Sequence, residues 1–328
     1  MIENIKLSKI SSPHVRDKST IGQIMRDVLI ALIPATLVAI LAFGWYMLVL
    51  ALVGLIGGSL IDVFVMKVLR RKKDYVFDGS GAVTGLLLAL NIPASFPMFL
   101  FIIGLLFALF VGKHVFGGLG HNFLNPALIG RVFLLISFPL QMTTWVKPAW
   151  LHFTRASYDL QTTATPLALL KENGIIQAHE RFNAFIGNIP GSAGEISAIA
   201  LIIGGAYLLL RHVITWHIPV SYVGTVAGIS AIFWLVNPGK YGDPIFHVVS
   251  GGLLLGAIFM ATDMVTSPET PKGMVIFGVG CGALTMLIRY FGGYPEGVSF
   301  SILIMNALVP FIEKVSHPRR LGEVKNRA

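Results

Sequence analysis

Long apolar runs dominate this sequence of 328 residues. Eight runs are long enough to cross roughly 30 Å of hydrocarbon as helices, and two more are short or interrupted by Pro and Gly. The chain is 55% hydrophobic and only 12% charged, so it has more apolar surface than a water-soluble fold of this size can bury. We therefore predict an all-α integral membrane protein with about ten transmembrane helices. The long runs are 24–43, 45–66, 96–112, 194–210, 216–236, 245–261, 273–291 and 298–314, and the interrupted ones are 81–95 and 126–141.

The distribution of Lys and Arg indicates how these segments are oriented. Ten crossings place both termini on one side of the membrane, and basic residues of short loops are retained on the cytoplasmic side. With the N-terminus inside, most basic residues, Lys113 among them, fall in cytoplasmic loops or tails, and the short outer loops keep only Lys240 and Arg289. We expect a protein of the plasma (bacterial inner) membrane with cytoplasmic segments at 1–23 and 315–328 and no cleaved signal peptide.

The segment 142–193 is the one long stretch whose composition resembles that of soluble protein. It separates two groups of five predicted helices, 24–141 and 194–314. The orientation derived from the basic residues places it outside the cytoplasm. We therefore expect an extracytoplasmic loop between two membrane-embedded halves.

Composition also argues against several kinds of site. The net charge of +9 is spread over loops between apolar runs, which argues against a nucleic-acid partner. A single cysteine, Cys281, excludes a disulfide framework and an iron–sulfur cluster held by this chain alone, because such a cluster needs about four thiolates. The histidines lack metal-ligand spacing, so we predict no metal site. Membrane lipid is the expected surrounding, and redox activity would need an organic cofactor or a partner's metal.

The two halves contain similar features in the same order. In each half a Ser-Gly pair opens a Leu-rich stretch, prolines follow, a basic residue precedes a Gly-Gly pair, and an Asn accompanies the last span. Because five spans separate the copies, the second would cross the membrane upside down, as in inverted-topology folds with a pocket where the repeats meet. Chance similarity between Gly-rich apolar helices is the alternative. The matched positions are Ser80 and Ser250, Pro93 and Pro97 with Pro268 and Pro271, Lys113 and Arg289, and Asn125 and Asn306.

These interruptions predict broken helices inside the membrane. Backbone N–H and C=O groups that leave a helix at membrane depth need protein, water or a ligand as partners, because lipid offers none. We expect half-helix ends at 80–84 and 250–252. Such ends suit a polar ligand held between the halves.

The segment 142–193 contains the hydroxyl-rich sequence DLQTTATP at 159–166. From the residues alone, this is a turn before a helix that begins near Pro166, with Thr165 as its N-cap. The stretch also resembles the flavinylation motif of bacterial flavin transferases, which runs Asp, two variable residues, Ser or Thr, usually Gly, then Ala and Thr. The resemblance implies a flavin transferase as partner and FMN joined to Thr165 through a phosphoester bond. The matching residues are Asp159, Thr162, Ala164 and Thr165, and Thr163 stands where Gly is usual.

Four further stretches resemble one family of membrane proteins. They are DGSGAVTG at 78–85, FGGLGHNFLNPA at 116–127, ATDMVTSP at 261–268 and YPEGVSF at 294–300. Over nearly all of its length the chain is similar to the NqrB/RnfD family. RnfD belongs to the Rnf complex, an ion-translocating ferredoxin:NAD oxidoreductase. NqrB belongs to the sodium-pumping NADH:quinone reductase and usually has a longer N-terminal extension, so the length of this chain favours the RnfD branch.

The resemblance implies a flavin-carrying redox subunit that is not a complete enzyme. Besides the covalent FMN it would hold a noncovalent flavin of the riboflavin type within the membrane, and relay electrons with coupled Na⁺ or H⁺ transport. Its implied partners are the other subunits of the complex, including a second FMN-bearing subunit and iron–sulfur subunits. A channel or transporter for a small solute is the alternative, since fold does not dictate function. A scaffold without a cofactor is a third interpretation.

Polar residues and glycines near the predicted spans are candidates for the noncovalent flavin pocket. Asn122, Asn125 and Asn306 offer amide groups to a ring edge. Gly117 and Gly118 let backbone approach a flat ligand closely, although they would also serve simply to turn the chain.

Charged residues at membrane depth are costly, so they are expected to be paired or functional. Arg131 could balance a flavin phosphate or form a salt bridge, and Glu296 belongs to the same group. For Asp62 and Asp263, near the cytoplasmic ends of spans, exposure to solvent is favoured over cation binding. No residue is predicted to be catalytic.

Overall fold

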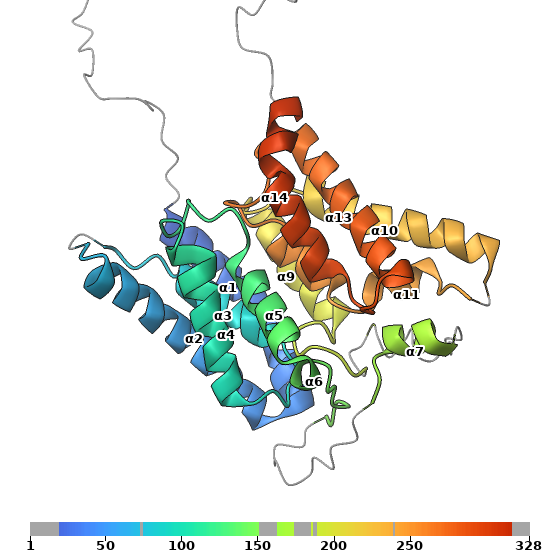
Figure 1. Cartoon of the computed structure of the whole chain (residues 1–328), viewed down its shortest axis with the longest axis horizontal. Helices are drawn as coiled ribbons and strands as arrows, with labels where there is room; N and C mark the ends of the chain where they lie inside the picture. Colours follow the sequence, from blue (N-terminus) through green and yellow to red (C-terminus); the bar gives the residue numbers. More distant parts are fainter. Residues whose placement is uncertain are drawn as a thin grey trace, which may run out of the picture.

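The computed structural model describes residues 20–72, 75–150, 163–173, 185, 189–238 and 240–316. Its regular elements are helices, which are coloured along the chain in Figure 1. The first half contains α1 (Ile21–Phe43), α2 (Trp45–Phe64) continued by the π-helical turn η1 (Val65–Leu69), α3 (Ser80–Leu90), α4 (Met98–Leu109) continued by η2 (Phe110–His114), α5 (Pro126–Ser137) and α6 (Pro139–Met142). After α7 (Pro166–Asn173) come α9 (Ala198–Leu210), α10 (His217–Val236), α11 (Pro244–Val249), α12 (Leu253–Leu255) with η4 (Gly256–Met260), α13 (Pro271–Phe291) and α14 (Val298–Ser316).

Helix length and hydropathy identify a multi-pass membrane protein. Large apolar side chains on the outer helices stay exposed, for example Leu60 and Phe99, as expected where lipid covers the surface. The predicted all-α class is confirmed for the described residues, whereas the number of full crossings and the inverted relation of the halves remain predictions. Five helices are long and apolar enough to cross a membrane, Ile21–Phe43, Trp45–Leu69, His217–Val236, Pro271–Phe291 and Val298–Ser316, and four apolar ones are shorter, Ser80–Leu90, Met98–His114, Pro126–Ser137 and Ala198–Leu210.

The two halves form two groups of helices side by side, α1–α6 in blue to green and α9–α14 in yellow to red (Figure 1). They meet where α1 packs on α9 and where α5 packs on α14. The start of α1 and the end of α14 lie toward the top of the view, and α7 lies toward the bottom. We call these two sides the N-terminal face and the α7 face.

Hydrogen bonds between helix ends fix which ends share the N-terminal face. Asp27, in the second turn of α1, accepts from Tyr207 Oη at 3.1 Å and pairs with Arg211 at 3.4 Å, so α9 ends there. Thr270, the N-cap of α13, donates to Ser316 at 2.8 Å, so α13 begins where α14 ends. Consecutive long helices therefore run in opposite directions between the two faces.

Two helix ends lie inside the bundles at the positions predicted from the sequence. Gly79, with a φ of 79°, lets α3 begin at Ser80. Gly251, with a φ of 69°, separates α11 from α12. The run 245–261 is therefore not the single helix that its hydropathy indicates, because Ser250 and Gly251 leave helical geometry.

The run 194–210 also begins its helix later than expected. Residues 189–197 form a buried loop against the end of α3, and α9 begins only at Ala198. The loop's N–H groups at Ala193 and Gly194 donate to the carbonyls of Ile92 at 3.1 Å and Leu90 at 2.7 Å. Backbone that leaves a helix inside the protein thus finds protein partners.

Glycines let α2 and α3 cross at close range. A Cβ added at Gly85 would collide with the backbone of Gly54, and a Cβ at Gly58 would collide with that of Gly81. Small residues at a helix crossing are the usual way to obtain tight packing in a membrane, where lipid competes for apolar contact.

Replacement of Gly85 by Ala should destabilise the protein by about 1–3 kcal/mol, because the added methyl group overpacks the α2–α3 crossing. Gly224→Ala is the matched control: Gly224 lies within α10, where an added Cβ meets nothing within 4 Å. That exchange should be neutral or slightly stabilising, since Ala has the higher helix propensity. Unfolding in detergent measures both variants, and equal stabilities would contradict the tight crossing.

Candidate functional site

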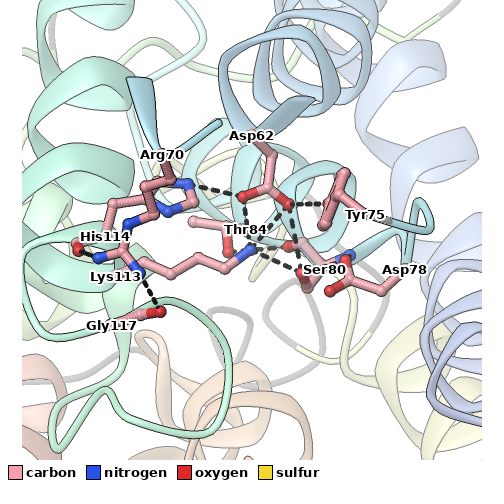
Figure 2. A network of polar contacts seen from close by, with 9 residues as sticks. All are labelled: Asp62, Arg70, Tyr75, Asp78, Ser80, Thr84, Lys113, His114 and Gly117. Carbon is pink, nitrogen blue, oxygen red and sulfur yellow. Dashed lines mark hydrogen bonds and ion pairs between the residues drawn. The ribbon is translucent and has the colours of Figure 1, made fainter. Parts of the chain in front are cut away.

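A buried ionic cluster lies near the N-terminal face, between the end of α2 and η2 (Figure 2). The Asp62 carboxylate accepts from Lys113 Nζ at 2.8 Å to each oxygen, and Oδ1 lies 2.7 Å from His114 Nε2. Lys113 Nζ also donates to Ser80 Oγ at 2.6 Å, and Tyr75 Oη donates to Asp62 Oδ2 at 3.2 Å. We call Asp62, Tyr75, Ser80, Lys113 and His114 the Asp62 cluster.

Local backbone geometry positions the two cations of this cluster. η2 is a π-helical turn, a form that is frequent at functional sites and that changes the direction of the side chains following α4. The Arg70 guanidinium donates to the carbonyls of His114 and Gly117 and so fixes the end of this turn (Figure 2). Gly117 and Gly118 have φ values of 136° and 100°, which turn the chain away from η2. The alternative role of these glycines in turning the chain is therefore present.

Asp62 and Lys113 are almost completely buried, with side chains 1% and 3% exposed. The expectations of a solvent-exposed Asp62 and of a loop charge at Lys113 are therefore wrong. Hydropathy places both residues near the ends of apolar runs, but it does not show that they are paired. Each charge is tolerated inside the protein because the other neutralises it and further hydrogen bonds satisfy both.

A cavity next to the Asp62 cluster lies between the two halves, and we call it the central cavity. α1, α9 and η4 provide apolar wall residues such as Val28, Leu208 and Phe259. Asp263 lies at this cavity only half-buried, where it accepts from Thr266 Oγ1 at 3.1 Å. Burial raises the pKa of Asp263. The polar wall consists of Ser80, Thr84, Lys113, Asn122, Asn125, Thr262 and Asp263.

Asn125 and Asn306 connect the two halves. Asn125 caps α5 through Oδ1 and donates from Nδ2 to the Met260 carbonyl at 3.2 Å. With its amide nitrogen toward the carbonyls of Thr266 and Ile302, Asn306 accepts from the Asn125 N–H at 3.2 Å. Both amides are therefore engaged in bonds that hold α5, α14 and the segment after η4 together.

Asn122 differs from the other two predicted asparagines. It is 3% exposed and donates to the Leu124 carbonyl at 3.3 Å. Its Oδ1 is buried and has no hydrogen-bond partner among the described residues. Asn122 therefore contributes an unused acceptor to the wall of the central cavity.

A second buried cluster lies toward the α7 face. Arg131 of α5 donates to Glu296 Oε2 at 2.5 Å and to Ser299 Oγ at 2.6 Å, so the salt bridge considered for this residue is present. Glu195, in the buried loop 189–197, accepts from the Ser192 N–H at 2.8 Å. We call Arg131, Glu195, Glu296 and the neighbouring Arg289 the Glu195 cluster.

Arg289 satisfies the broken backbone between α11 and α12. Its guanidinium donates to the carbonyls of His247 at 2.6 Å and Ser250 at 3.0 Å. The residue lies within α13 and is 4% exposed, so its assignment to a short outer loop is wrong. The helix end at Ser250 thus obtains from a side chain the partners that lipid cannot provide.

Thr165 lies at the start of α7, and its Oγ1 accepts from the Ala168 N–H at 3.2 Å. The predicted N-cap role of Thr165 is therefore confirmed. The residue also lines a small cavity together with Ser250 and Glu195. Of the other motif residues, Ala164 is exposed, and Asp159 and Thr162 lie outside the described residues.

Sequence reasoning did not select Lys113, His114, Glu195 or Arg289 as site residues. A signal was present for two of them, because Lys113 and Arg289 occupy matching positions in the two halves. Glu195 is the only acidic residue of the segment 189–197, where a charge beside an apolar run is unexpected. His114 carries no such signal.

Half-helices that end inside the bundles, and buried charges beside a cavity between two helical halves, define a multi-pass membrane protein with an interior built to hold charge. Residues 8–322 match the NQR2, RnfD, RnfE family, and the chain belongs to this family. The resemblance to RnfD found in the sequence motifs is confirmed by the high identity of the chain to relatives of that name class.

Three similar proteins match over almost their whole length. The D subunit of the proton-translocating ferredoxin:NAD(+) oxidoreductase complex of Clostridium ljungdahlii is 44% identical over 320 residues, 95% of each chain. The D subunit of the Na(+)-translocating ferredoxin:NAD(+) oxidoreductase complex of Acetobacterium woodii is 45% identical over 326 residues, 99% of this chain and 98% of the relative. The D subunit of the ion-translocating oxidoreductase complex of Stutzerimonas stutzeri is 39% identical over 329 residues, 93% of each chain.

Proposed function

We propose that this chain is the flavin-carrying membrane subunit of an ion-translocating ferredoxin:NAD⁺ oxidoreductase complex. The observation that carries this proposal is the similarity, over 95% and 99% of the chain, to two relatives that are named as the D subunit of such complexes. The chain would relay electrons between a covalent FMN and a buried flavin, with coupled transport of Na⁺ or H⁺. Its partners would be the other subunits, including a second FMN-bearing subunit and iron–sulfur subunits, and a flavin transferase.

Thr165 is the proposed attachment site of the FMN. Its hydroxyl oxygen caps the eight-residue helix α7. A phosphoester at this oxygen would lie at the positive end of the helix dipole, next to N–H groups without helical partners, and both features stabilise an anion. The N-cap geometry therefore suits the modification that the sequence motif implies.

The central cavity is the proposed pocket for the noncovalent flavin. The unused Oδ1 of Asn122 fits as an acceptor for a ring N–H, and the apolar wall suits the face of a flat ring. Lys113 adds a positive charge to the wall, which Asp62 balances. A bound flavin supplies the reversible uptake of electrons, and the residues around it bind it, orient it and exclude water.

The other predicted pocket residues have supporting positions in this proposal. Asn125 and Asn306 hold the two halves together beside the cavity, and Gly117 and Gly118 shape the loop after η2. Arg131 lies in the Glu195 cluster, toward the end of the molecule that carries Thr165.

We further propose that the halves are inverted repeats with about ten crossings in total. Lys113 bonds to Ser80 at the start of α3, and Arg289 bonds to Ser250 at the matching break in the second half. The N-terminal face would be cytoplasmic and the α7 face extracytoplasmic, where a transferase can reach Thr165. The basic residues of the loops favour this orientation.

Attachment of FMN predicts a simple result on a denaturing gel. After co-expression with a flavin transferase, the wild-type band should fluoresce under ultraviolet light, and Thr165→Ala should abolish the fluorescence, because the phosphoester needs the hydroxyl oxygen. Thr163→Ala is the matched control and should keep it, since the motif does not require a hydroxyl at that position. A dark wild-type band would contradict the covalent FMN.

The transporter alternative has a different readout. Liposomes that contain only this chain should not take up small solutes if it is a redox subunit. Solute uptake by such liposomes would favour a channel or transporter over the proposed function.

A further inference from the structure

The small cavity beside Thr165 contains an acidic oxygen without a partner. Glu195 is 3% exposed, and while Oε1 accepts from Ser192, Oε2 has no hydrogen-bond partner in the part of the chain that the structure describes. Ser250 Oγ, in the same cavity wall, is also buried and has no partner among those residues. The cavity leaves about 10 Å³ for the centre of a water molecule, which is roughly what one water needs.

Backbone geometry keeps space free for this carboxyl group. Gly252 follows the break between α11 and α12, and a Cβ at this position would lie only 2.7 Å from Glu195 Oε2. Any other residue at position 252 would therefore push against the carboxyl group. The second half of the chain thus presents a glycine and the Ser250 hydroxyl to Glu195.

Charged groups from three other elements face Glu195. Glu296, which precedes α14, adds a like charge, and Arg131 of α5 and Arg289 of α13 add positive ones. Arg131 donates to Glu296 and Ser299, and Arg289 donates to two backbone carbonyls, so both guanidinium groups are directed to other acceptors. Beyond Arg289 lie the further titratable groups His247, Tyr222 and Tyr290.

These surroundings favour the neutral carboxylic acid. Burial raises the pKa of Glu195 to about 7, and the charge of Glu296 raises it as well. Arg131 and the hydrogen bond from Ser192 act in the opposite direction. Loss of solvation by water is the largest cause, as for other buried carboxyl groups.

We propose that Glu195 is a proton-binding site, which carries a proton on Oε2 at neutral pH and exchanges it with water at the α7 face through the cavity beside Thr165. On release the O–H bond breaks, and the proton passes to a water molecule, leaving the carboxylate. A metal cation is disfavoured because Arg131 and Arg289 already place two positive charges at the site. The site does not depend on a flavin, so a failed FMN experiment and a failed proton experiment can be told apart.

Infrared spectroscopy of the purified full chain, produced without a flavin transferase, tests the proposal. The wild type should show the carbonyl stretching band of a protonated carboxylic acid that disappears as the pH rises through about 7. Glu195→Gln should remove this band, and Glu269→Gln, an exchange at an exposed glutamate, should leave it unchanged. Persistence of the band in Glu195→Gln, or its absence from the wild type at every pH below 7, would overturn the assignment.

Two further arms keep the test decisive. If Glu195→Gln does not fold, wild-type protein labelled with [¹³C]glutamate decides, because the band must shift if it comes from a glutamate and must stay if it comes from Asp263. At constant pH, NaCl and KCl should have the same effect on the band. A loss of the band in NaCl alone would overturn the proton assignment in favour of a sodium site.

The pH dependence of stability gives an independent readout. Between the ordinary Glu pKa of 4.5 and about 7, the folded protein binds more protons at Glu195 than the unfolded chain does. Stability of the wild type should therefore fall as the pH rises through this range. Glu195→Gln should lack this component of the pH dependence, and an unchanged melting profile against pH would contradict the proposal.

Discussion

Replacing Lys113 by Met should destabilise the protein by about 3–5 kcal/mol, the range found when one partner of a buried ion pair is removed. Lys113 Nζ bonds both oxygens of Asp62 and the Ser80 hydroxyl, and both charged side chains are almost completely buried. Without Lys113 the Asp62 carboxylate would keep its negative charge with only His114 and hydroxyl groups as partners. Unfolding in detergent micelles measures the loss.

A second exchange separates the charge effect from lost packing. The double variant Asp62→Asn with Lys113→Met removes both charges, and it should recover much of the stability lost in Lys113→Met. Lys272→Met, at an exposed residue, is the matched control and should change stability by less than about 0.5 kcal/mol. A double variant that is as unstable as the sum of its two single variants would show that the pair is not coupled.

Removal of Arg131 should have an effect of similar size at the other end of the molecule. Arg131→Met should destabilise the protein by about 3–5 kcal/mol, because it leaves Glu296 as a buried carboxylate beside Glu195. Glu296→Gln should be milder, because the loss of its charge lowers the pKa of Glu195, which then ionises and balances Arg131. Unfolding of both variants across the pH range around 7 measures this asymmetry.

Equal losses of stability in the two variants would contradict this asymmetry. If Arg131→Met and Glu296→Gln were equally unstable, Glu195 would not compensate for the missing carboxylate. Glu269→Gln again provides the control for removing an exposed acidic group.

The positions of the helices could be predicted closely from the sequence. The run 216–236 became α10 (His217–Val236), because an uninterrupted apolar stretch of that length has few alternatives to a helix in lipid. The breaks before Ser80 and after Ser250 were also predictable, since glycines with positive φ accompany both. Hydropathy failed where an apolar run contains a break, as in 245–261, because an average over the run does not detect two residues that leave the helix.

The site was predictable only in part. Thr165 and its N-cap role follow from a local pattern, and local patterns are readable in sequence. The pairing of Asp62 with Lys113 joins residues 51 positions apart, and the bond from Arg131 to Glu296 joins residues 165 apart. Counting basic residues assigns such cations to loops, because the count does not include the carboxylate that allows a cation to be buried.

The attachment of the loop 189–197 to α3 has a consequence for how the chain assembles. The carbonyls of Leu90 and Ile92, at the inner end of α3, receive their hydrogen bonds from Gly194 and Ala193. While the ribosome is still synthesising the residues in between, these acceptors have no permanent partner, and lipid cannot replace it. The first five helices therefore reach their final arrangement only after the chain beyond residue 194 has been made, so that biogenesis of the two halves is concerted and not sequential.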